Sequence, residues 1–476
     1  MLRQKIRQAF TKQNTLDTEA ISHRQKLTFL QRMLRWSLNI NRSMLIGLSF
    51  VVLIFAGALL LSLPIAHQNG QWAHPLDALF TAASASCVTG LVVWDTANEL
   101  TLFGQLVLIF LIQVGGIGIM TISTLFSIGF GRRMKIRQLL LVQESLNQDA
   151  PSNVIHVAIN VLKYTFVTEF VFGTLLALCF YDKMGAHAFY WGYWHAVSAF
   201  CNAGFDLTGN FDSFVGFQSH ILLNLCLILL IIIGGIGFTV IDDVLSNRCW
   251  RKLTLHSKIV LTVNGALIIA GTLIIWLLEQ HNAATLGSLN IAWQWLAALF
   301  QSVSLRTAGF NTINLAALTN ATLFFMVCMM FIGASPASTG GGIKTTTFAV
   351  LLASTVALLR DKKDVVLFNR RLDTAIIHKS LAIFLLAISW CLLAIFLLLF
   401  LDDKNQPVQF VIFEVISAMG TVGMGVGITP EWNSWCKLVL IITMFIGRIG
   451  ILTFGMSFFN KKADHLRYPT ENIMIG

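Results

Sequence analysis

The segment MFIGASPASTGGGIKTTTFAVLL, residues 330–352, decides how the rest of the chain is interpreted. It begins and ends like an apolar helix, but residues 333–347 hold four glycines, one proline and a run of hydroxyl side chains. Pro336 removes a helical hydrogen-bond donor, and each of the three glycines from Gly340 onward costs about 1 kcal/mol relative to alanine in a helix. The pattern therefore predicts a long apolar helix that is interrupted in its middle.

The composition is that of a membrane protein. Hydrophobic residues make up 56% of the 476 residues, charged residues make up 12%, and the mean hydropathy is +0.73. Soluble domains carry about 25% charged residues. Apolar runs long enough to cross about 30 Å of hydrocarbon recur, for example at 43–63, 220–241 and 380–401. A lipid-exposed span must satisfy its own backbone hydrogen bonds, so these runs predict an all-α polytopic membrane protein.

The distribution of basic residues predicts the orientation in the membrane. The net charge is +10, and 26 of the 33 Lys and Arg residues fall into five segments that follow every second span. By the positive-inside rule these segments are cytoplasmic, so both termini of this multi-pass protein are expected on the cytoplasmic side of the cell (inner) membrane. Charge placed in this way argues against a nucleic-acid partner and for contact with membrane lipid. The five segments are 1–42, 129–154, 242–258, 359–379 and 460–467.

Several other classes of site find no support in the sequence. The first 42 residues lack the apolar core and cleavage site of a signal peptide. The eight cysteines are scattered without a C-x-x-C pair, which argues against a metal or redox centre. The eleven histidines do not cluster in the spans, so no catalytic residue and no enzymatic activity are predicted. GGGIKTTT at 340–347 lacks the glycine directly before the lysine of a P-loop, so no nucleotide cofactor is expected in this chain.

Four copies of a small glycine motif divide the chain into similar units. The motifs are SCVTGL at Gly90, FCNAGF at Gly204, LRTAGF at Gly309 and MGTVGM at Gly423, spaced by 114, 105 and 114 residues. A short amphipathic segment, too short to span the membrane, precedes each motif. A second marker follows each motif inside a long apolar span: QVGGIGIMT, IIGGIGFTV, FIGASPAST and FIGRIGILT. Each unit is therefore predicted as long helix, short half-helix, glycine loop and long helix.

The four units predict a fold of eight transmembrane helices and four pore loops around a pseudo-fourfold pore. Irregular backbone at membrane depth must be buried in protein or face a water-filled path, and one unit cannot enclose such a path. The second span of the third unit is the only one predicted to be broken. The predicted spans are 43–63, 101–128, 155–180, 218–241, 257–279, 321–358, 376–401 and 435–459. The predicted domains are a basic arm at 1–42, pore repeats at 43–128, 155–241, 257–358 and 376–459, and a tail at 460–476.

The four glycine loops are candidates for a cation filter built from backbone carbonyls. Glycine reaches positive φ without a Cβ penalty, and backbone held in that way can turn successive carbonyls toward a common axis. Half-helices that end at the loops would direct their negative C-terminal dipoles at the ion. The alternative is that the glycines only allow close helix packing. The candidate filter residues are Val88, Thr89, Gly90, Asn202, Ala203, Gly204, Thr307, Ala308, Gly309, Thr421, Val422 and Gly423.

These features resemble the Trk/Ktr/HKT superfamily of potassium transporters. SLRTAGFNT at 304–312, the four pore loops and GASPASTGGGIKT at 333–345 carry the resemblance, which extends from about residue 40 to the end of the chain. The resemblance implies a potassium-translocating subunit that forms a homodimer on a cytoplasmic nucleotide-binding regulatory ring of RCK type. Eight spans without an extra helix pair are most similar to the KtrB type, in which potassium uptake often depends on sodium. One glycine per loop, in place of the two in potassium channels, predicts weaker discrimination against sodium.

Charged residues inside the predicted spans are expected to face a cavity or a partner. Arg448 occupies a position that Gly or Ala holds in the other units. It is interpreted either as a barrier to cations below the filter or as a cap on the carbonyls of a neighbouring helix. Arg306, beside the third motif, is expected to donate to the carbonyls of its own loop. Glu169 and Glu414 are expected either to pair with these cations or to stabilise the half-helices.

The interrupted helix of the third unit is interpreted as a gate on the cytoplasmic side of the filter. Its hydroxyl groups can satisfy freed backbone groups, and few packed contacts are expected to hold it. The alternative is a static kink. A different function, an alternating-access carrier coupled to sodium, expects matching broken helices in the two halves of the chain. The candidate gating residues are Gly333, Ser335, Pro336, Ser338, Thr339, Gly340, Gly341, Gly342, Lys344 and Arg448.

Overall fold

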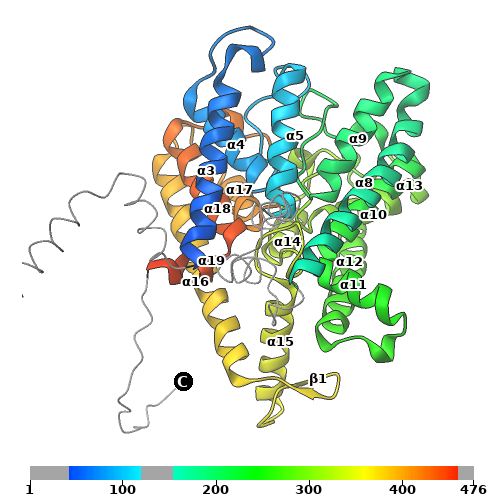
Figure 1. Ribbon diagram of the computed structural model, residues 1–476, viewed down its shortest axis with the longest axis vertical. Coiled ribbons are helices and arrows are strands. Elements are labelled where there is room, and N and C mark those ends of the chain that lie inside the picture. Colours follow the sequence, from blue (N-terminus) through cyan, green and yellow to red (C-terminus); the bar gives the residue numbers. More distant parts are fainter. Residues whose placement is uncertain (1–41, 119–153, 459–476) are drawn as a thin grey trace, which may run out of the picture.

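The computed structural model describes residues 42–118 and 154–458, which form a bundle of helices (Figure 1). The predictions for the basic arm up to residue 41, the segment 119–153 and the tail from residue 459 lie outside the described residues. The described part is nearly all helical, which confirms the predicted fold class. Its only sheet is a hairpin of β1 (Val366–Leu367) and β2 (Arg370–Arg371), which the sequence pattern did not indicate.

The first helix of each unit is continuous. These helices are α3 (Arg42–Ser62), α8 (Val154–Met184), α12 (Leu255–Glu279) and α16 (Thr374–Leu401), close to the predicted spans. All four are long and apolar enough to cross a membrane. A polar side chain sets the start of α12, where the Thr254 hydroxyl accepts from the Ser257 N–H as a helix cap.

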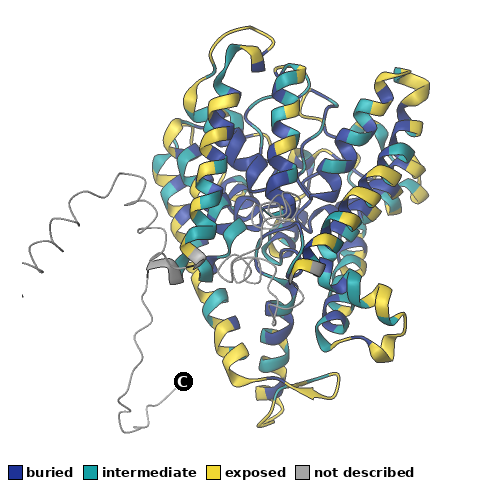
Figure 2. Ribbon diagram, viewed as in Figure 1, coloured by how far each residue is buried: buried dark blue, intermediate teal, exposed yellow. Residues whose placement is uncertain are grey.

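The four predicted half-helices are present. They are α4 (Pro75–Ser86), α9 (His187–Phe200), α13 (Ile291–Ser304) and α17 (Val408–Gly420). Each has 12–14 residues, so at 1.5 Å per residue each crosses only part of the hydrocarbon layer. Their C-terminal residues lie in the buried centre of the bundle (Figure 2). Short 3-10 turns lie in the connections: η1 (Pro64–Ala66), η3 (Val215–Phe217), η4 (Trp250–Lys252), η5 (Leu315–Ala317) and η6 (Thr429–Glu431).

The second helices are interrupted in more than one unit, so the prediction that only the third unit has a broken span is wrong. α5 (Leu102–Ile117) ends at Gly118, the last described residue of its segment. α10 (Ile221–Ile236) bends by 96° into α11 (Phe238–Asn247). The loop 332–344 separates α14 (Asn320–Phe331) from α15 (Thr345–Leu359), as predicted. α18 (Ser434–Ile449) gives way to α19 (Ile451–Phe458).

The breaks have a common cause in the second glycine-rich marker. Gly118, Gly237 and Gly450 have φ of 92°, 101° and 91°, which a right-handed helix does not allow. The apolar pattern continues through each marker, and a glycine inside a helix costs only about 1 kcal/mol. Periodicity therefore does not distinguish a tolerated glycine from a break. Among the described residues, α10, α14 and α18 thus each lead across a break into a further helix, and α5 ends at Gly118.

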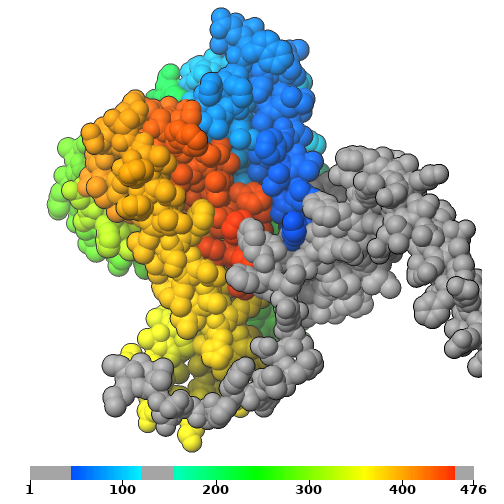
Figure 3. Space-filling model, turned by 90° about the vertical axis from the view of Figure 1, so that its left-hand side faces the viewer, coloured from blue at the N-terminus to red at the C-terminus, as the bar shows by residue number. Residues whose placement is uncertain are grey.

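The first and fourth units lie side by side, so the four units close into a ring. α18 packs against α4, and α19 packs against α3. Figure 3 shows the start of the described chain, in blue, against its end, in red. A salt bridge joins the two units, because Lys437 Nζ lies 2.7 Å from Asp77 Oδ1. The two side chains are 10% and 21% exposed. Asp77 also lies in the first turn of α4, where the helix dipole favours a carboxylate.

Removing one partner of this salt bridge is expected to destabilise the protein more than removing both. Lys437→Met and Asp77→Asn each leave a largely buried group without its partner, at a cost of about 2 kcal/mol after allowance for partial exposure. The double variant is expected to recover part of that loss. Thermal unfolding of the purified protein in detergent ranks the stabilities of the parent, the two single variants and the double variant. Lys404→Met, in a pair whose side chains are 46% and 55% exposed, is the control and is expected to change little. A double variant less stable than both single variants would contradict the prediction.

Candidate functional site

The four glycine loops share one backbone conformation. Each contains a non-glycine residue with positive φ, then one residue, then the motif glycine, also with positive φ. The first set is Val88 (56°), Asn202 (59°), Thr307 (70°) and Thr421 (50°). The second set is Gly90 (98°), Gly204 (74°), Gly309 (83°) and Gly423 (86°). Positive φ at alternate residues turns successive carbonyls to the same side of the strand, as a carbonyl filter requires.

The four motif glycines form a closed ring in which backbone packs on backbone. A Cβ atom added to Gly204 would lie 2.8 Å from the Ala308 carbonyl oxygen. One added to Gly309 would lie 2.5 Å from the Val422 carbonyl oxygen. The motif glycine of the fourth loop meets the first loop even more tightly, and that of the first loop meets the second. The structure therefore brings all four predicted filter segments together, and only glycine fits at the ring positions.

The non-glycine residues with positive φ were not indicated by the sequence. Val88 is β-branched, and left-handed backbone is strained for such residues. Burial holds it in place, because Val88 and its three counterparts are fully buried. Asn202 is the one residue type among the four that favours this conformation, so it was the one available signal. Its side-chain amide pairs with the Thr307 hydroxyl at 3.3 Å, which joins the second loop to the third.

Serines near the ends of the half-helices hold the loops from behind. Ser84 and Ser417 accept hydrogen bonds from the N–H of the motif glycine of their own loop, at 3.0 and 3.1 Å. Ser198 and Ser304 donate to the carbonyl of the residue after the motif glycine, at 2.6 and 2.5 Å. All four serines are fully buried. No prediction from the sequence included them, although a serine stands six residues before the motif glycine in three loops and five before it in the third.

Two further polar side chains hold the backbone that follows the ring. His195 Nε2 accepts from the Leu207 N–H at 3.1 Å, while Nδ1 contacts a carbonyl one turn earlier on α9 at 2.8 Å. These contacts fit a neutral ring with its proton on Nδ1. At the equivalent position of the fourth unit, Glu414 accepts from the Val426 N–H at 3.1 Å and the Thr429 hydroxyl at 2.9 Å. His195 is therefore a buried structural side chain.

Of the two interpretations of Glu169 and Glu414, the pairing with arginines is wrong. Glu414 bonds to the loop of its own unit, as described above. Glu169 on α8 accepts from Gln113 Nε2 on α5 at 3.0 and 3.1 Å. Within residues 42–118 and 154–458, no salt bridge involves Arg306 or Arg448. The glutamates instead satisfy neutral donors, which fits the alternative that they stabilise the structure around the half-helices.

A cavity of about 420 Å³ opens onto one side of the ring, and we call it the outer cavity. The four motif glycines lie at its base, and Asp95, Asp206, Asp212 and Glu431 are among the residues that line it. Burial raises the pKa of Asp206, so this carboxylate loses its charge at a less acidic pH than a free aspartate does. An acidic cavity in front of a carbonyl ring raises the local concentration of cations.

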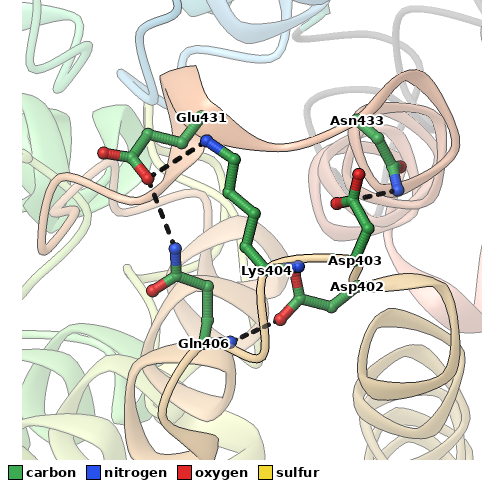
Figure 4. A network of polar contacts seen from close by, with 6 residues as sticks. All are labelled: Asp402, Asp403, Lys404, Gln406, Glu431 and Asn433. Carbon is green, nitrogen blue, oxygen red and sulfur yellow. Dashed lines mark hydrogen bonds and ion pairs between the residues drawn. The ribbon is translucent and has the colours of Figure 1, made fainter.

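One of the four acids in the outer cavity has a basic neighbour. Lys404 Nζ lies 3.4 Å from Glu431 Oε2, and Gln406 Nε2 donates to the same oxygen at 3.4 Å (Figure 4). The Asp402 carboxylate accepts from the Gln406 N–H at 2.6 Å and so orders the same connection. These exposed contacts add little stability. They do offset the charge of Glu431, so the three aspartates carry most of the negative charge of the cavity.

On the opposite side of the ring lies the third-unit loop, residues 332–344. Gly340 packs against the Thr307 side chain, and the Gly341 N–H donates to the Thr421 hydroxyl at 3.0 Å. A Cβ on Gly342 would lie 3.1 Å from the carbonyl oxygen of Gly420, the residue before Thr421. Three consecutive glycines thus let this loop lie directly against two of the four filter segments.

The third-unit loop is held by many contacts, so the prediction of few packed contacts is wrong. The N–H groups of Ser335 and Thr339 each donate to a carbonyl of α10 at 3.2 Å, and both residues are fully buried. The Ser338 hydroxyl donates to the Ser335 carbonyl at 2.7 Å, so one hydroxyl satisfies freed backbone as expected. Gly333 and Pro336 are buried as well. The sequence pattern indicated missing helical bonds but not the neighbouring helices that replace them.

Arg448 lies where the first, third and fourth units meet. Its guanidinium donates to carbonyls at the end of α5, at 3.1 Å for Gly116, and also to the Thr339 carbonyl of the third-unit loop. It therefore caps a neighbouring helix, one of its two expected roles, and at the same time holds the loop. Lys344 Nζ donates to the Gly340 carbonyl at 2.8 Å, within the loop itself.

Arg306 does not donate to the carbonyls of its own loop, so that prediction is wrong. Its Nη2 donates to the carbonyl of Gly333, in the third-unit loop, at 3.0 Å. Arg306 thus reaches the neighbouring segment and not the loop of its own motif. Arg306 and Arg448 thus both bond to the third-unit loop.

Glu414→Ala is expected to lower the free energy of unfolding by about 2 kcal/mol, because two buried donors lose a charged acceptor. Glu414→Gln keeps an acceptor oxygen and is expected to lie between the alanine variant and the parent. Thermal unfolding of the purified protein ranks the stabilities of the parent and the two Glu414 variants. Glu431→Ala, at the exposed rim of the outer cavity, is the matched control and is expected to change little. The prediction fails if the two alanine variants lose equal stability.

Comparison with known proteins agrees with this architecture. Residues 18–465 match the family described as TrkH, cation transport protein. The chain is 40% identical over 434 residues to the Ktr system potassium uptake protein B of Bacillus subtilis (strain 168), covering 90% of this chain and 96% of that protein. The protein of the same name from Vibrio alginolyticus is 40% identical over 437 residues (91% and 94%). The potassium/sodium uptake protein NtpJ of Enterococcus hirae is 37% identical over 438 residues (91% and 96%).

A solved structure has the same fold. The potassium transporter TrkH from Vibrio parahaemolyticus matches with a TM-score of 0.68 at 19% identity, covering 88% of this chain and 85% of that chain. At that identity the likeness concerns the fold alone. The match over residues 18–465 and the relatives at 37–40% identity establish the family and confirm the resemblance seen in the sequence. This chain belongs to the TrkH family of cation transport proteins.

Proposed function

We propose that this chain is the pore-forming subunit of a potassium uptake system in the cell membrane. One observation carries the proposal: four loops of equal conformation close a ring of backbone around an axis. Carbonyl oxygens in such a ring can replace the hydration shell of a monovalent cation. The relatives from Bacillus subtilis and Vibrio alginolyticus are potassium uptake proteins, and the relative from Enterococcus hirae is a potassium/sodium uptake protein. Their names support potassium as the main ion and sodium as a second, stimulating or coupled ion.

The cation is bound by backbone and not by side chains. The segments 88–90, 202–204, 307–309 and 421–423 supply the carbonyls, and their side chains differ between the units. The C-terminal ends of the four half-helices face this region and favour a cation. The acidic outer cavity delivers ions to the ring. Transport of this kind needs no cofactor and no catalytic group in the chain, so the proposed activity is not enzymatic.

The third-unit loop acts as the gate. It lies against Thr307 and Thr421 of the filter, so an ion leaving the ring on that side meets the loop. The charges of Lys344 and Arg448 oppose a cation there. Opening must break the bonds of the loop to α10 and to Arg448. The tight contacts also fit a static kink, so the effect of loosening them on flux decides between the two roles.

A cytoplasmic partner controls the gate in this proposal. The third-unit loop leads through α15 into the hairpin β1–β2, which extends away from the bundle (Figure 1). Exposed basic residues gather there: Arg360, Lys362, Lys363, Arg370 and Arg371. By the positive-inside rule this end faces the cytoplasm, together with both termini. A homodimer seated on a ring of nucleotide-binding RCK-type subunits would pull on the loop through α15.

An alternating-access carrier coupled to sodium is the second candidate. The breaks at Gly237 and Gly450 favour it, because helices broken at matching positions are typical of such carriers. The breaks recur from unit to unit around the ring and do not single out two halves. A pore with four equivalent loops therefore remains the better explanation.

Ion flux into liposomes tests the proposal. The purified chain is expected to take up rubidium down its gradient, with potassium competing more strongly than sodium. A pore, even one that sodium stimulates, conducts rubidium down its gradient with equal sodium on both sides, whereas a coupled carrier accumulates rubidium against its gradient when a sodium gradient is imposed. Absence of rubidium uptake under both conditions, with a folded protein, would refute the proposed function.

Gly423→Ala is expected to lower the preference for potassium over sodium about tenfold, equivalent to roughly 1.4 kcal/mol. Gly427 in the same loop is the matched control. The two glycines have φ of 86° and 90°, but a Cβ on Gly423 collides with the first loop, whereas Gly427 has nothing within 4 Å. Both alanine variants carry backbone strain, and only Gly423→Ala distorts the ring. Competition of potassium and sodium with rubidium uptake measures the preference. An equal loss of potassium preference in both variants would show that backbone strain alone is responsible.

Arg448→Gln is expected to raise rubidium flux through the chain alone severalfold, because the loop loses a charged donor at Thr339. The ion preference is expected to stay unchanged. Arg360→Gln, which removes an exposed arginine at the end of α15, controls for the loss of charge and is expected not to raise this flux. Flux per folded protein, with folding followed by gel filtration, is the measurement. A folded Arg448→Gln variant that conducts like the parent would assign Arg448 a purely structural role.

A further inference from the structure

Arg306 carries donor groups that nothing in the described part of the chain accepts. Its side chain is only 5% exposed. Nη2 donates to the Gly333 carbonyl at 3.0 Å, but Nε and Nη1 have no partner among the described residues. An unsatisfied buried donor on a charged group is strongly unfavourable. Native proteins satisfy such groups with ordered water or a bound ion.

A small cavity is lined in part by Arg306. It has a volume of about 20 Å³ and is lined by Arg306, by Asn264 of α12 and by mostly aliphatic residues of α10, α12 and α13. About 10–15 Å³ is enough for one water molecule, so the cavity has room for one water and for no larger polar ligand. Gly235 and Ala334 also line it, which places it between α10 and the third-unit loop.

The chemistry of the wall distinguishes water from an anion. Asn264 Nδ2 donates to the Val260 carbonyl at 2.7 Å and to the Ser335 hydroxyl at 3.0 Å, so both amide hydrogens are used. The amide oxygen of Asn264 is left as an acceptor. Water can accept from Arg306 and donate to Asn264. Chloride can only accept, and would meet the amide oxygen without a hydrogen bond.

We propose that one buried water bridges Arg306 to Asn264, and that these three groups clamp the start of the third-unit loop. Arg306 holds the carbonyl of Gly333, and Asn264 holds the hydroxyl of Ser335. Arg306 directly precedes Thr307, so the clamp also links a filter segment to the loop. This inference rests on the proposed function of the loop as the gate. Arg306 and Asn264 are positioning residues, because the clamp acts on the loop and not on the ion.

Hydrogen exchange of the full chain in lipid nanodiscs tests the clamp without relying on transport. The amides of Ser335 and Thr339 are bonded to α10 and report on the loop. Asn264→Leu and Arg306→Gln are each expected to speed exchange across residues 333–345 about tenfold. Arg306→Lys keeps one donor for Gly333 and is expected to lie in between. Ile269→Ala, at a residue of α12 that is 71% exposed, is the control and is expected to leave exchange unchanged.

The double variant tests the bridge itself. Both single changes break the same water bridge. The factor by which the double variant speeds exchange is therefore expected to be smaller than the product of the two single factors. A double effect equal to that product would overturn the bridge. An experimental map of the unmodified protein is expected to show one water in contact with Nε or Nη1 of Arg306. An empty cavity, or bromide bound there after exchange of chloride for bromide, would overturn the assignment of water.

Rubidium flux separates the clamp from the proposed function. If the parent transports no rubidium, the proposed function fails, and hydrogen exchange alone still decides whether the clamp exists. If the parent transports rubidium, Asn264→Leu is expected to raise flux through the chain alone severalfold while the potassium preference stays the same. Faster exchange with unchanged flux would overturn the link between the clamp and the gate.

Discussion

Backbone N–H and C=O groups in the hydrocarbon layer have no bulk water with which to form hydrogen bonds. The centre of this protein must therefore satisfy these groups from within the structure. Four half-helices end inside the bundle, and each is followed by irregular backbone. Buried serines form hydrogen bonds with the backbone of the loops. His195 and Glu414 accept hydrogen bonds from backbone N–H groups in the segments that follow the second and fourth loops. Because the rear of each loop is held in this way, its carbonyls are free to face the axis. The ring of backbone therefore depends on these neutral and acidic side chains behind it.

The four units repeat their backbone more closely than their side chains. The position of His195 and Glu414 is taken by Thr81 in the first unit and by Gln301 in the third, whose side-chain oxygens have no partner among the described residues. The second filter residue is threonine, alanine or valine. Such variation is tolerated where the ligand is a carbonyl, because the side chain then only fills space. Glycine is invariant at the ring because each Cβ would enter the neighbouring loop.

The third-unit loop and the filter are in direct contact, and two arginines hold the loop in place. Arg306 reaches it from the filter side and Arg448 from the fourth unit. Moving the loop leaves buried charged groups without their acceptors, which is far more costly than breaking neutral bonds. The loop is thus stable as it stands in the structure, and opening beyond a low basal level needs energy from elsewhere. A partner that binds differently to two states of the protein can supply such energy.

The sequence by itself determined the membrane class, the four units, the half-helices, the four glycine loops and the interruption at 333–347. These follow from local composition and from repetition, which depend on hydrophobic length and on glycine and proline chemistry. Only the tertiary structure decided the left-handed backbone of Val88, the break at Gly237 and the partners of Arg306 and Glu414. A φ value, a bend or a hydrogen-bond partner depends on which distant segment is adjacent. A long arginine side chain can reach several acceptors, and the packing of α10, α12 and the third-unit loop around it selects one of them.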